Sequence, residues 1–166
     1  IANDAAYTTA VTYQNVSDST ATIQFSFYNE ATGTAINHTV DPLPAGAGSS
    51  LFVGSLSQIA AGFNGSAVLS SDQPVVATLV QISSDGNVKN RPLSNGFEQG
   101  SSTVLLASLL KNQFSTNSQF SIQNADSGAI DVTVEIYDSA NPTAAPITIT
   151  ELNLPQGAAK YFDMGT

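Results

Sequence analysis

Residues 22–27 read TIQFSF and residues 131–136 read DVTVEI, and in both stretches polar and apolar side chains alternate strictly. A period of two places one set of side chains on a core face and the other set in water, as in a half-buried β-strand. Residues 75–82 are apolar on both faces, which is typical of a central strand. Turn-forming Gly, Pro, Asn and Asp residues separate these runs, so we predict an all-β sandwich or barrel. The one helix-like stretch, residues 55–61, is expected to form a single turn between strands.

The two alternating stretches belong to an internal repeat. Residues 13–29 align without a gap with residues 122–138, at an offset of 109 residues (124 − 15, counted on the Asn of a shared Gln-Asn pair). Further along, LPAG at residues 43–46 aligns with LPQG at residues 154–157, at an offset of 111 (154 − 43). The alignment keeps the apolar positions in phase, as duplicated strands require. The positions expected to face the core are Ile23, Phe25 and Phe27 in one copy and Val132, Val134 and Ile136 in the other.

The repeat predicts two β-sandwich units: residues 1–83 form the first, residues 84–100 a polar linker, and residues 101–166 a second, incomplete one. Residues 103–110 are expected to form the opening strand of the second copy, which lacks a counterpart of residues 62–82. A sandwich that misses strands exposes an apolar slot and unpaired backbone edges. We therefore expect neighbouring repeats of a longer chain, or other copies acting by strand addition, to complete it. The alternative is an abbreviated sandwich with a covered edge.

Composition narrows the classes of function. Only 10% of the residues are charged, and a net charge of −9 leaves too few cations to neutralise phosphates, so we expect no nucleic-acid partner. No apolar run approaches the length of a membrane span, so we expect no membrane insertion. The absence of cysteine rules out disulfides and thiol chemistry. A polar surface built from Ser, Thr, Asn, Gln and Gly predicts a secreted or cell-surface protein, and the start at Ile1 is what we expect of a processed product.

Several short motifs resemble parts of catalytic sites. DSGA at residues 126–129 matches the nucleophile motif of aspartic proteases, but such enzymes need a second carboxylate that shares a proton. Its only near copy, DMGT at residues 163–166, lacks the hydroxyl residue, so we interpret the first motif as a turn. His38 is the only histidine, too few for the zinc sites or serine triads that use several partners. The acids that a glycosidase would pair are scattered over expected turns, linker and exposed faces: Glu30, Glu98, Glu135 and Glu151.

Two acidic turns and three sequons complete the candidates. Residues 85–87 and 138–141 offer oxygen ligands for calcium, yet turn chemistry accounts for both. Asn15, Asn37 and Asn64 each begin an Asn-X-Ser/Thr sequon, and Asn64 is the best glycan acceptor among them. For Asn15 a turn is the better explanation, because the aligned Asn of the second copy carries no sequon. We therefore predict no catalytic, cofactor-binding or metal-binding residues, and no enzymatic activity.

Two segments connect the chain to a known class of module. GFNGSAV at residues 62–68 and SDQPVVA at residues 71–77 resemble segments of the immunoglobulin-like β-sandwich repeats of secreted and cell-surface bacterial proteins in envelopes or filaments. The resemblance implies an immunoglobulin-like fold for each unit and a place in fibres, surface layers or adhesin stalks. It carries over no functional residues, because these modules have no catalytic signature.

These observations lead to two hypotheses of function. The first is a non-catalytic structural subunit of an extracellular surface assembly or filament, which polymerises head-to-tail as a homopolymer, with strand addition as one mode of contact. The second is an adhesin or carbohydrate-binding module of a secreted protein, since sandwiches often carry ligands on their loops. A monodisperse monomer that binds a glycan would favour the second hypothesis, and ordered polymers would favour the first.

Overall fold

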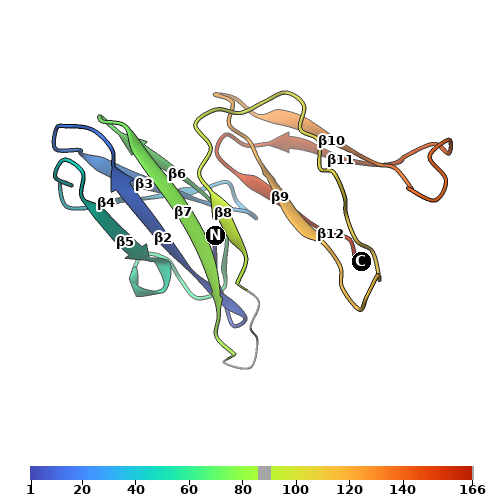
Figure 1. Cartoon of the computed structure of the whole chain (residues 1–166), viewed down its shortest axis with the longest axis horizontal. Helices are drawn as coiled ribbons and strands as arrows, with labels where there is room; N and C mark the ends of the chain where they lie inside the picture. Colours follow the sequence, from blue (N-terminus) through green and yellow to red (C-terminus); the bar gives the residue numbers. More distant parts are fainter. Residues whose placement is uncertain (86–90, 166) are drawn as a thin grey trace. The chain divides into compact units, whose positions relative to one another are not determined.

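The structure is a computed structural model that describes residues 1–85 and 91–165 (Figure 1). Apart from one short 3-10 turn, its regular elements are antiparallel strands, which confirms the all-β class. The chain divides into two compact units, Ile1–Gln99 and Gly100–Thr166. Unit 1 contains β1 (Ala2–Asn3), β2 (Tyr7–Asn15), β3 (Ile23–Asn29), β4 (Ala35–Thr39), β5 (Gly48–Phe52), β6 (Phe63–Ser71), β7 (Val75–Ser83) and β8 (Leu93–Asn95). Unit 2 contains β9 (Gln119–Gln123), β10 (Ile130–Ile136), β11 (Ile147–Leu154) and β12 (Ala159–Asp163).

The strands of unit 1 form sandwich-like antiparallel layers. The strand order is β4-β3-β6-β1-β2-β7-β8. Outside this order, β5 pairs with β2 on the side opposite β7. The two-residue β1 pairs with both β6 and β2, so it links the two halves of this arrangement. The expectation of a central strand over residues 75–82 is confirmed, because β7 pairs with β2 on one side and β8 on the other.

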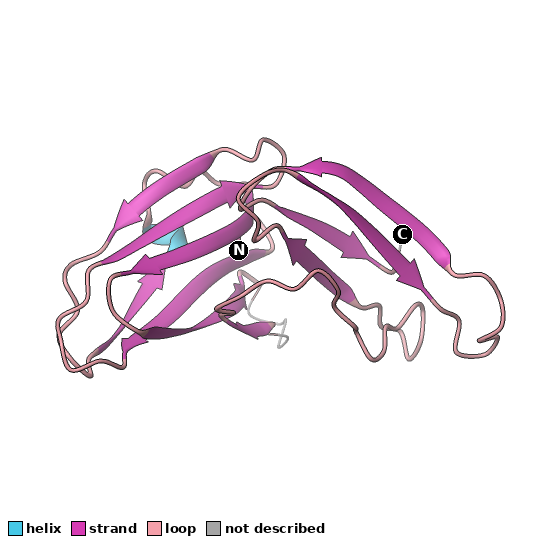
Figure 2. Cartoon of the chain, turned by 90° about the horizontal axis from the view of Figure 1, so that it is seen from above, coloured by secondary structure: helices cyan, strands magenta, loops and turns pink. Residues whose placement is uncertain are grey.

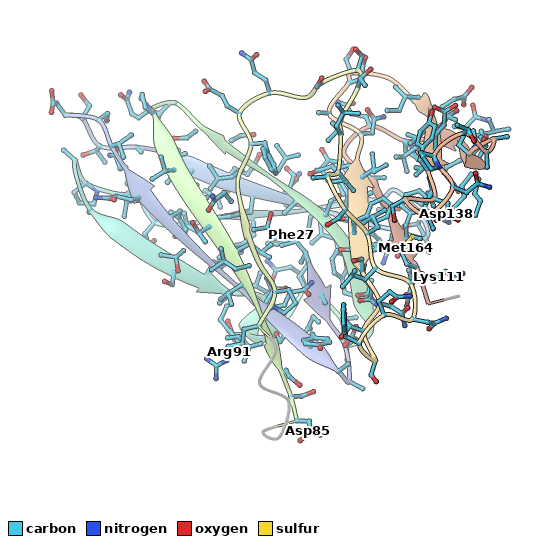
Figure 3. All side chains as sticks on the ribbon, turned by 45° about the vertical axis from the view of Figure 1, so that its right-hand side comes forward. Phe27, Asp85, Arg91, Lys111, Asp138 and Met164 are labelled. Carbon is cyan, nitrogen blue, oxygen red and sulfur yellow. The ribbon has the colours of Figure 1, made fainter. Side chains whose placement is uncertain are left out.

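The core of unit 1 lies between the inner faces of β2 and β3. The alternating side chains of β3 point inward, and Phe25 and Phe27 are at most 1% exposed, with Phe27 inside the unit in Figure 3. Tyr13 of β2 meets Phe25 edge-on, with ring centroids 5.3 Å apart, which joins the two layers. Other buried members of the core are Val11, Leu51, Val53, Leu56, Ile59 and Phe63. Period-two alternation therefore places the core of unit 1 correctly.

One short helical element interrupts the strands. Val53–Ser55 forms a single 3-10 turn, drawn in cyan in Figure 2, directly after β5. The expected turn at residues 55–61 thus begins two residues earlier, because Val53 is anchored in the core and its carbonyl accepts the Leu56 N–H at 3.1 Å. Among the described residues no helix is long and apolar enough to cross a membrane.

Unit 2 consists of two two-stranded ribbons, one made of β10 and β11 and the other of β12 and β9. Its buried apolar residues are few, and among the described residues they are Leu154, Ala158 and Ala159. A two-stranded ribbon is only marginally stable without a further strand or layer on its apolar face. Unit 2 therefore has the strands of a sandwich and a much smaller core than unit 1.

The expected opening strand over residues 103–110 is wrong. This segment is irregular, and Val104 and Leu105 are 72% and 90% exposed. At its end, Leu110 and Ser118 exchange hydrogen bonds. An apolar, β-prone sequence becomes a strand when a neighbouring edge supplies backbone partners, and no strand of the described residues pairs with this segment.

The segment expected as a linker contributes to unit 1. Residues 93–95 form β8, which pairs with residues 78–80 of β7. Gly96 continues the contact by donating its N–H to the Ala77 carbonyl at 2.9 Å. Polar composition indicated a linker, but the free edge of β7 offered backbone partners to this stretch.

Candidate functional site

A buried asparagine organises the end of β2 in unit 1. The side-chain amide of Asn15 donates to the carbonyl oxygens of Ser19, Leu43 and Pro44 at 2.6, 3.0 and 3.2 Å. Its side-chain oxygen accepts the Ser17 N–H at 2.9 Å. Asn15 is fully buried, and these bonds satisfy its own side-chain amide and carbonyl groups in place of water. The side chain thereby holds the β2–β3 turn against the segment that leads into β5.

The same bonds recur in unit 2. The side-chain amide of Asn124 donates to the carbonyl oxygens of Gly128 and Leu154 at 2.7 and 2.9 Å, and its side-chain oxygen accepts the Asp126 N–H at 2.8 Å. These partners lie at the offsets of 109 and 111 residues found in the sequence. Asn124 is also fully buried. The aligned glycines Gly46 and Gly157 both have a positive φ, 70° and 75°, so both turns use the left-handed conformation that glycine favours.

Strand registers follow the same offsets. In unit 1, Val11 of β2 lies opposite Leu51 of β5, and at the aligned positions Phe120 of β9 lies opposite Phe162 of β12. The residue pairs of β3 with β4 and of β10 with β11 correspond in the same way: Gln24↔Thr39 with Thr133↔Thr150, Phe25↔His38 with Val134↔Ile149, Ser26↔Asn37 with Glu135↔Thr148, and Phe27↔Ile36 with Ile136↔Ile147. Strands β9 to β12 therefore occupy the places that β2 to β5 have in unit 1.

The two units differ in what covers these strands. In unit 1, β3 pairs with β4 on one side and β6 on the other, and β2 pairs with β5 and β7. Within the described part of unit 2, β10 has β11 as its only strand partner, and β9 has only β12. The uncovered places are those that β6 and β7 fill in unit 1. One edge of β10 corresponds to the edge of β3 that pairs with β6 in unit 1. We call this edge, together with the apolar face of the β10–β11 ribbon, the open face.

The open face is apolar and only partly covered. Val134 and Ile136 of β10 are half-buried, and Ile149 and Ile147 lie directly opposite them at 40% and 67% exposure. In the second ribbon, Phe120 and Phe162 are likewise half-buried, with stacked rings 5.0 Å apart. Their counterparts in unit 1, Val11 and Leu51, are buried in the core.

The charges of unit 2 shape what can approach it. Six acids, namely Asp126, Asp131, Glu135, Asp138, Glu151 and Asp163, outnumber Lys111 and Lys160. Lys160 pairs with Glu151 at 3.4 Å on the surface. The Gly165 N–H and the Gln119 amide donate to the exposed Asp163 and lower the pKa of its carboxyl. An acidic surface of this kind favours partners that carry little negative charge.

The motifs that resemble catalytic sites take part in local structure within their own units. Asp126 and Ser127 form the turn between β9 and β10, where the Ser127 N–H donates to the Asp126 carboxylate at 2.6 Å. His38 lies on β4, with its Nδ1 2.9 Å from the side-chain amide nitrogen of Gln58. The sequence-based interpretation of residues 126–128 as a turn agrees with this geometry.

The scattered acids serve separate local contacts. Glu135 accepts a hydrogen bond at 3.0 Å from the Tyr137 hydroxyl, which raises the pKa of that tyrosine. Glu98 is exposed, and Glu30 follows the end of β3. In residues 1–85 and 91–165 no three His, Cys, Asp or Glu side chains gather as metal ligands would.

The calcium candidates divide between described and undescribed residues. Asp138 caps its own turn by accepting the Ala140 N–H at 2.9 Å, as an Asx turn does. Of the other candidate only Asp85 is described, and Gly86 and Asn87 lie outside the described residues.

The three sequons lie in different environments. Asn15 is buried and its side chain is engaged, so it offers no room for a glycan. Asn37 is exposed on β4 and accepts the Ser26 hydroxyl at 2.8 Å. Asn64 is half-buried on β6 beside β1, a more enclosed position than sequence reasoning assumed for the best acceptor.

The buried N-terminal amine is a feature that sequence reasoning missed. The α-amino group of Ile1 donates to the Gly65 carbonyl at 2.8 Å inside unit 1. Burial lowers its pKa from 8.0 to about 6, and the nearby Glu30 carboxylate offsets part of that shift. An apolar first residue was the only sequence signal.

Comparisons with known proteins give no relative to reason from: no family model, curated protein or solved structure matches the chain. The open face of unit 2 is therefore the candidate functional site on geometric grounds alone.

Proposed function

We propose that the chain is a non-catalytic structural subunit of an extracellular surface assembly or filament, built from two immunoglobulin-like units that arose by duplication. The matching bonds of Asn15 and Asn124 and the matching strand registers support the duplication. The low content of charged residues, 10%, and a polar surface rich in hydroxyl and amide groups support an extracellular location.

One observation carries the structural role: the apolar strands that are covered in unit 1 are open in unit 2. Phe25 of β3 is 1% exposed between β4 and β6, whereas the aligned Val134 of β10 is half-buried beside β11 alone. An edge with unsatisfied N–H and C=O groups and an apolar face is a template for adding strands. In this proposal a neighbouring repeat completes unit 2, and the contact is head-to-tail because the donor and acceptor surfaces differ.

The proposal is tested on the source cells and on the purified chain together. Antibodies raised against residues 1–166 are expected to label fibres or a surface layer in immunogold electron microscopy. Sedimentation of the purified chain then separates the two sources of the neighbour. Ordered polymers identify other copies, and a monomer that nevertheless labels fibres identifies neighbouring repeats of a longer polypeptide. Label confined to the cell interior would refute the proposal.

The second candidate is a glycan-binding or adhesin module, and one observation favours it. Phe114 is 91% exposed in a loop where Asn112, Phe114 and Ser115 all have positive φ values. Bulky residues rarely adopt this conformation, and an aromatic ring held out to solvent suits stacking on a sugar. Binding of the purified chain on a glycan array, abolished by Phe114→Ala and kept in Phe97→Ala, would establish this function in place of the structural one.

A further inference from the structure

We propose that one outer face of unit 1 binds a flat, neutral polysaccharide chain of the cellulose type. The sheet that presents this face consists of β5, β2, β7 and β8, which pair side by side in that order (Figure 1). Its outward side chains are those of the even-numbered residues of β2, β5 and β7, together with Leu93 and Asn95 of β8. We call this side the four-stranded face. The inference goes beyond the proposed function and does not rest on it.

Strand alternation decides which side chains lie on the four-stranded face. Val11 and Tyr13 of β2 are buried in the core, and Leu79 of β7 packs against it. Successive side chains of a strand point to opposite faces, so the even-numbered neighbours of these residues point away from the core. Thr12 is accordingly exposed, and so is Val76, at 54%. The four-stranded face is therefore a solvent-exposed side of a unit whose core lies behind it.

Strand register arranges these side chains in two neighbouring rows that cross all four strands. The apolar row runs from β5 to β8 through Phe52, Ala10, Val80 and Leu93. The polar row runs beside it through Ser50, Thr12, Thr78 and Asn95. Neighbours within a row are about 4.8 Å apart, and the two rows are about 7 Å apart. The ends of the apolar row, Phe52 and Leu93, are 44% and 66% exposed, so the row is accessible to a ligand.

Hydrogen bonds along the polar row hold its side chains in place. The hydroxyl oxygens of Thr12 and Ser50 are 3.1 Å apart, and the Thr78 hydroxyl donates to the side-chain oxygen of Asn95 at 3.2 Å. Each hydroxyl oxygen keeps a lone pair for a further donor. Because the side chains are already ordered, a ligand that bonds to them pays little additional conformational entropy. An apolar surface with a few well-placed polar groups is the usual composition of a site for a neutral ligand.

Charge restricts the class of ligand. The side chains that make up the four-stranded face are all uncharged, although the chain contains thirteen acids and has a net charge of −9. A polyanion would be repelled by the chain as a whole, and a cationic ligand would find no carboxylate within the face. An uncharged ligand meets neither obstacle, so the charge distribution favours a neutral polymer.

The size of the four-stranded face favours a thin ligand over a second copy of the chain. Four strands are about 19 Å wide, and the 5 residues of β5 span about 17 Å, which gives an area of roughly 300 Å². A stable protein–protein interface buries about 800 Å² on each partner. A single polysaccharide chain needs only the apolar row and the polar row beside it.

The shape of a cellulose-type chain matches the two rows. In such a chain the C–H bonds point out of the flat faces of each sugar ring, and the hydroxyl groups lie at its edges. One flat face would lie on the apolar row between Phe52 and Leu93. The hydroxyl groups at the adjacent edge would then exchange hydrogen bonds with Thr12 and Thr78 in the polar row.

Depletion of the purified chain from solution by suspended microcrystalline cellulose measures the affinity. We expect Leu93→Asp to weaken binding at least ~10-fold, because it places a charge against the apolar face of the sugar. Thr12→Ala should weaken binding about 2- to 10-fold, the contribution of one hydrogen bond. The matched control is Val68→Asp, the same kind of change at a 38% exposed position on the outer side of the β3–β6 layer, and it should bind as the unchanged chain does. Phe114→Ala should also bind unchanged, which separates this face from the loop of unit 2.

Circular dichroism and urea unfolding show whether each variant folds, and Thr12→Ala decides the question if Leu93→Asp does not fold. Two further probes test the class of ligand. Granular starch, whose neutral chains coil, should bind more weakly than cellulose, and the polyanion pectate should not bind.

Four outcomes would overturn the inference. The first is no binding of the unchanged chain to cellulose. The second is equal binding by all the variants, or a loss in Val68→Asp or Phe114→Ala as large as in Leu93→Asp. The third is binding to starch or pectate that equals binding to cellulose. The fourth is a dimer, detected by sedimentation, that Leu93→Asp dissociates, because a second copy would then cover the face. Cellulose binding together with antibody label confined to the cell interior would refute the proposed function and leave this inference standing.

Discussion

Replacement of Asn15 by alanine tests whether one buried amide holds the turns of unit 1 together. The substitution removes the donor to the Leu43 and Pro44 carbonyls and to the Ser19 carbonyl, and the acceptor of the Ser17 N–H. Each hydrogen bond contributes about 0.5–1.5 kcal/mol net, and a buried group left without a partner costs about 1–3 kcal/mol.

The cost is limited by the partners that remain. The Leu43 carbonyl still accepts the Ala21 N–H at 2.8 Å, so it is not left unsatisfied. Ser19 is exposed, so water can reach its carbonyl. We therefore expect Asn15→Ala to lower the free energy of unfolding by about 2–4 kcal/mol, the sum of a few lost bonds without a fully orphaned group.

The assay is thermal unfolding followed by far-ultraviolet circular dichroism, with urea unfolding for the free energies. For a unit of this size, 1 kcal/mol corresponds to about 4–8 °C, so the melting temperature of unit 1 should fall by roughly 10–30 °C. The matched control is the neighbouring Gln14→Ala, whose exposed side chain makes one bond, to the Gly46 carbonyl at 3.1 Å, and which should change stability by less than about 0.5 kcal/mol. Equal effects of the two substitutions would show that water replaces the Asn15 amide and would refute the reasoning.

Two further predictions follow from burial. In urea unfolding, Phe25→Ala should lower the free energy of unfolding by about 3–5 kcal/mol and Val134→Ala by clearly less, because Phe25 is 1% exposed and Val134 is half-buried. A larger loss of free energy for Val134→Ala would mean that the open face is covered in solution. In the folded chain the pKa of the Ile1 α-amino group is lowered from 8.0 to about 6. Between pH 6 and pH 8 the unfolded chain therefore binds more protons than the folded chain, and the free energy of unfolding should rise by up to about 2–3 kcal/mol over that range. An N-acetylated chain should show no such rise, and a rise of equal size in that chain would assign the effect to another group.

The sequence predicted those parts of the fold that depend on local pattern. Alternation placed Phe25 and Phe27 in the core, because a strand has only two faces and one of them must be apolar. The shared Gln-Asn pair indicated turns at these positions; Asn15 ends β2 and Asn124 follows β9, and both side chains bond backbone groups of the turn that comes next.

The sequence did not predict which strands find partners. Residues 103–110 are as apolar as β7, yet β7 forms between two neighbours and residues 103–110 form no strand. Residues 93–95, in a largely polar stretch, form β8 because the β7 edge lies beside them. β-propensity describes fit to a pleated surface, so its outcome depends on distant residues that a local pattern does not contain.

The candidate site could also be predicted only in part, because the covering of a strand depends on distant residues. Comparison of the two copies indicated that residues 62–82 have no counterpart in the second, and the uncovered edge of β10 lies where that counterpart would pair. Alternation predicted that Val134 faces the core as Phe25 does, and the structure leaves Val134 half-buried, since alternation shows which face a side chain occupies but not how completely that face is covered.

The apolar row on β10 is itself an argument for an occupant. A two-stranded ribbon that stays permanently in water needs no apolar face, and exposed apolar edges promote aggregation that proteins avoid with charges on the strand. β10 carries its charges, Asp131 and Glu135, on the face opposite Val132, Val134 and Ile136. In unit 1, β3 also keeps polar side chains opposite its apolar row, and there β6 pairs with its edge. A strand that keeps one face strictly apolar under these conditions is built to be covered, which supports the proposal that a neighbouring repeat covers the open face.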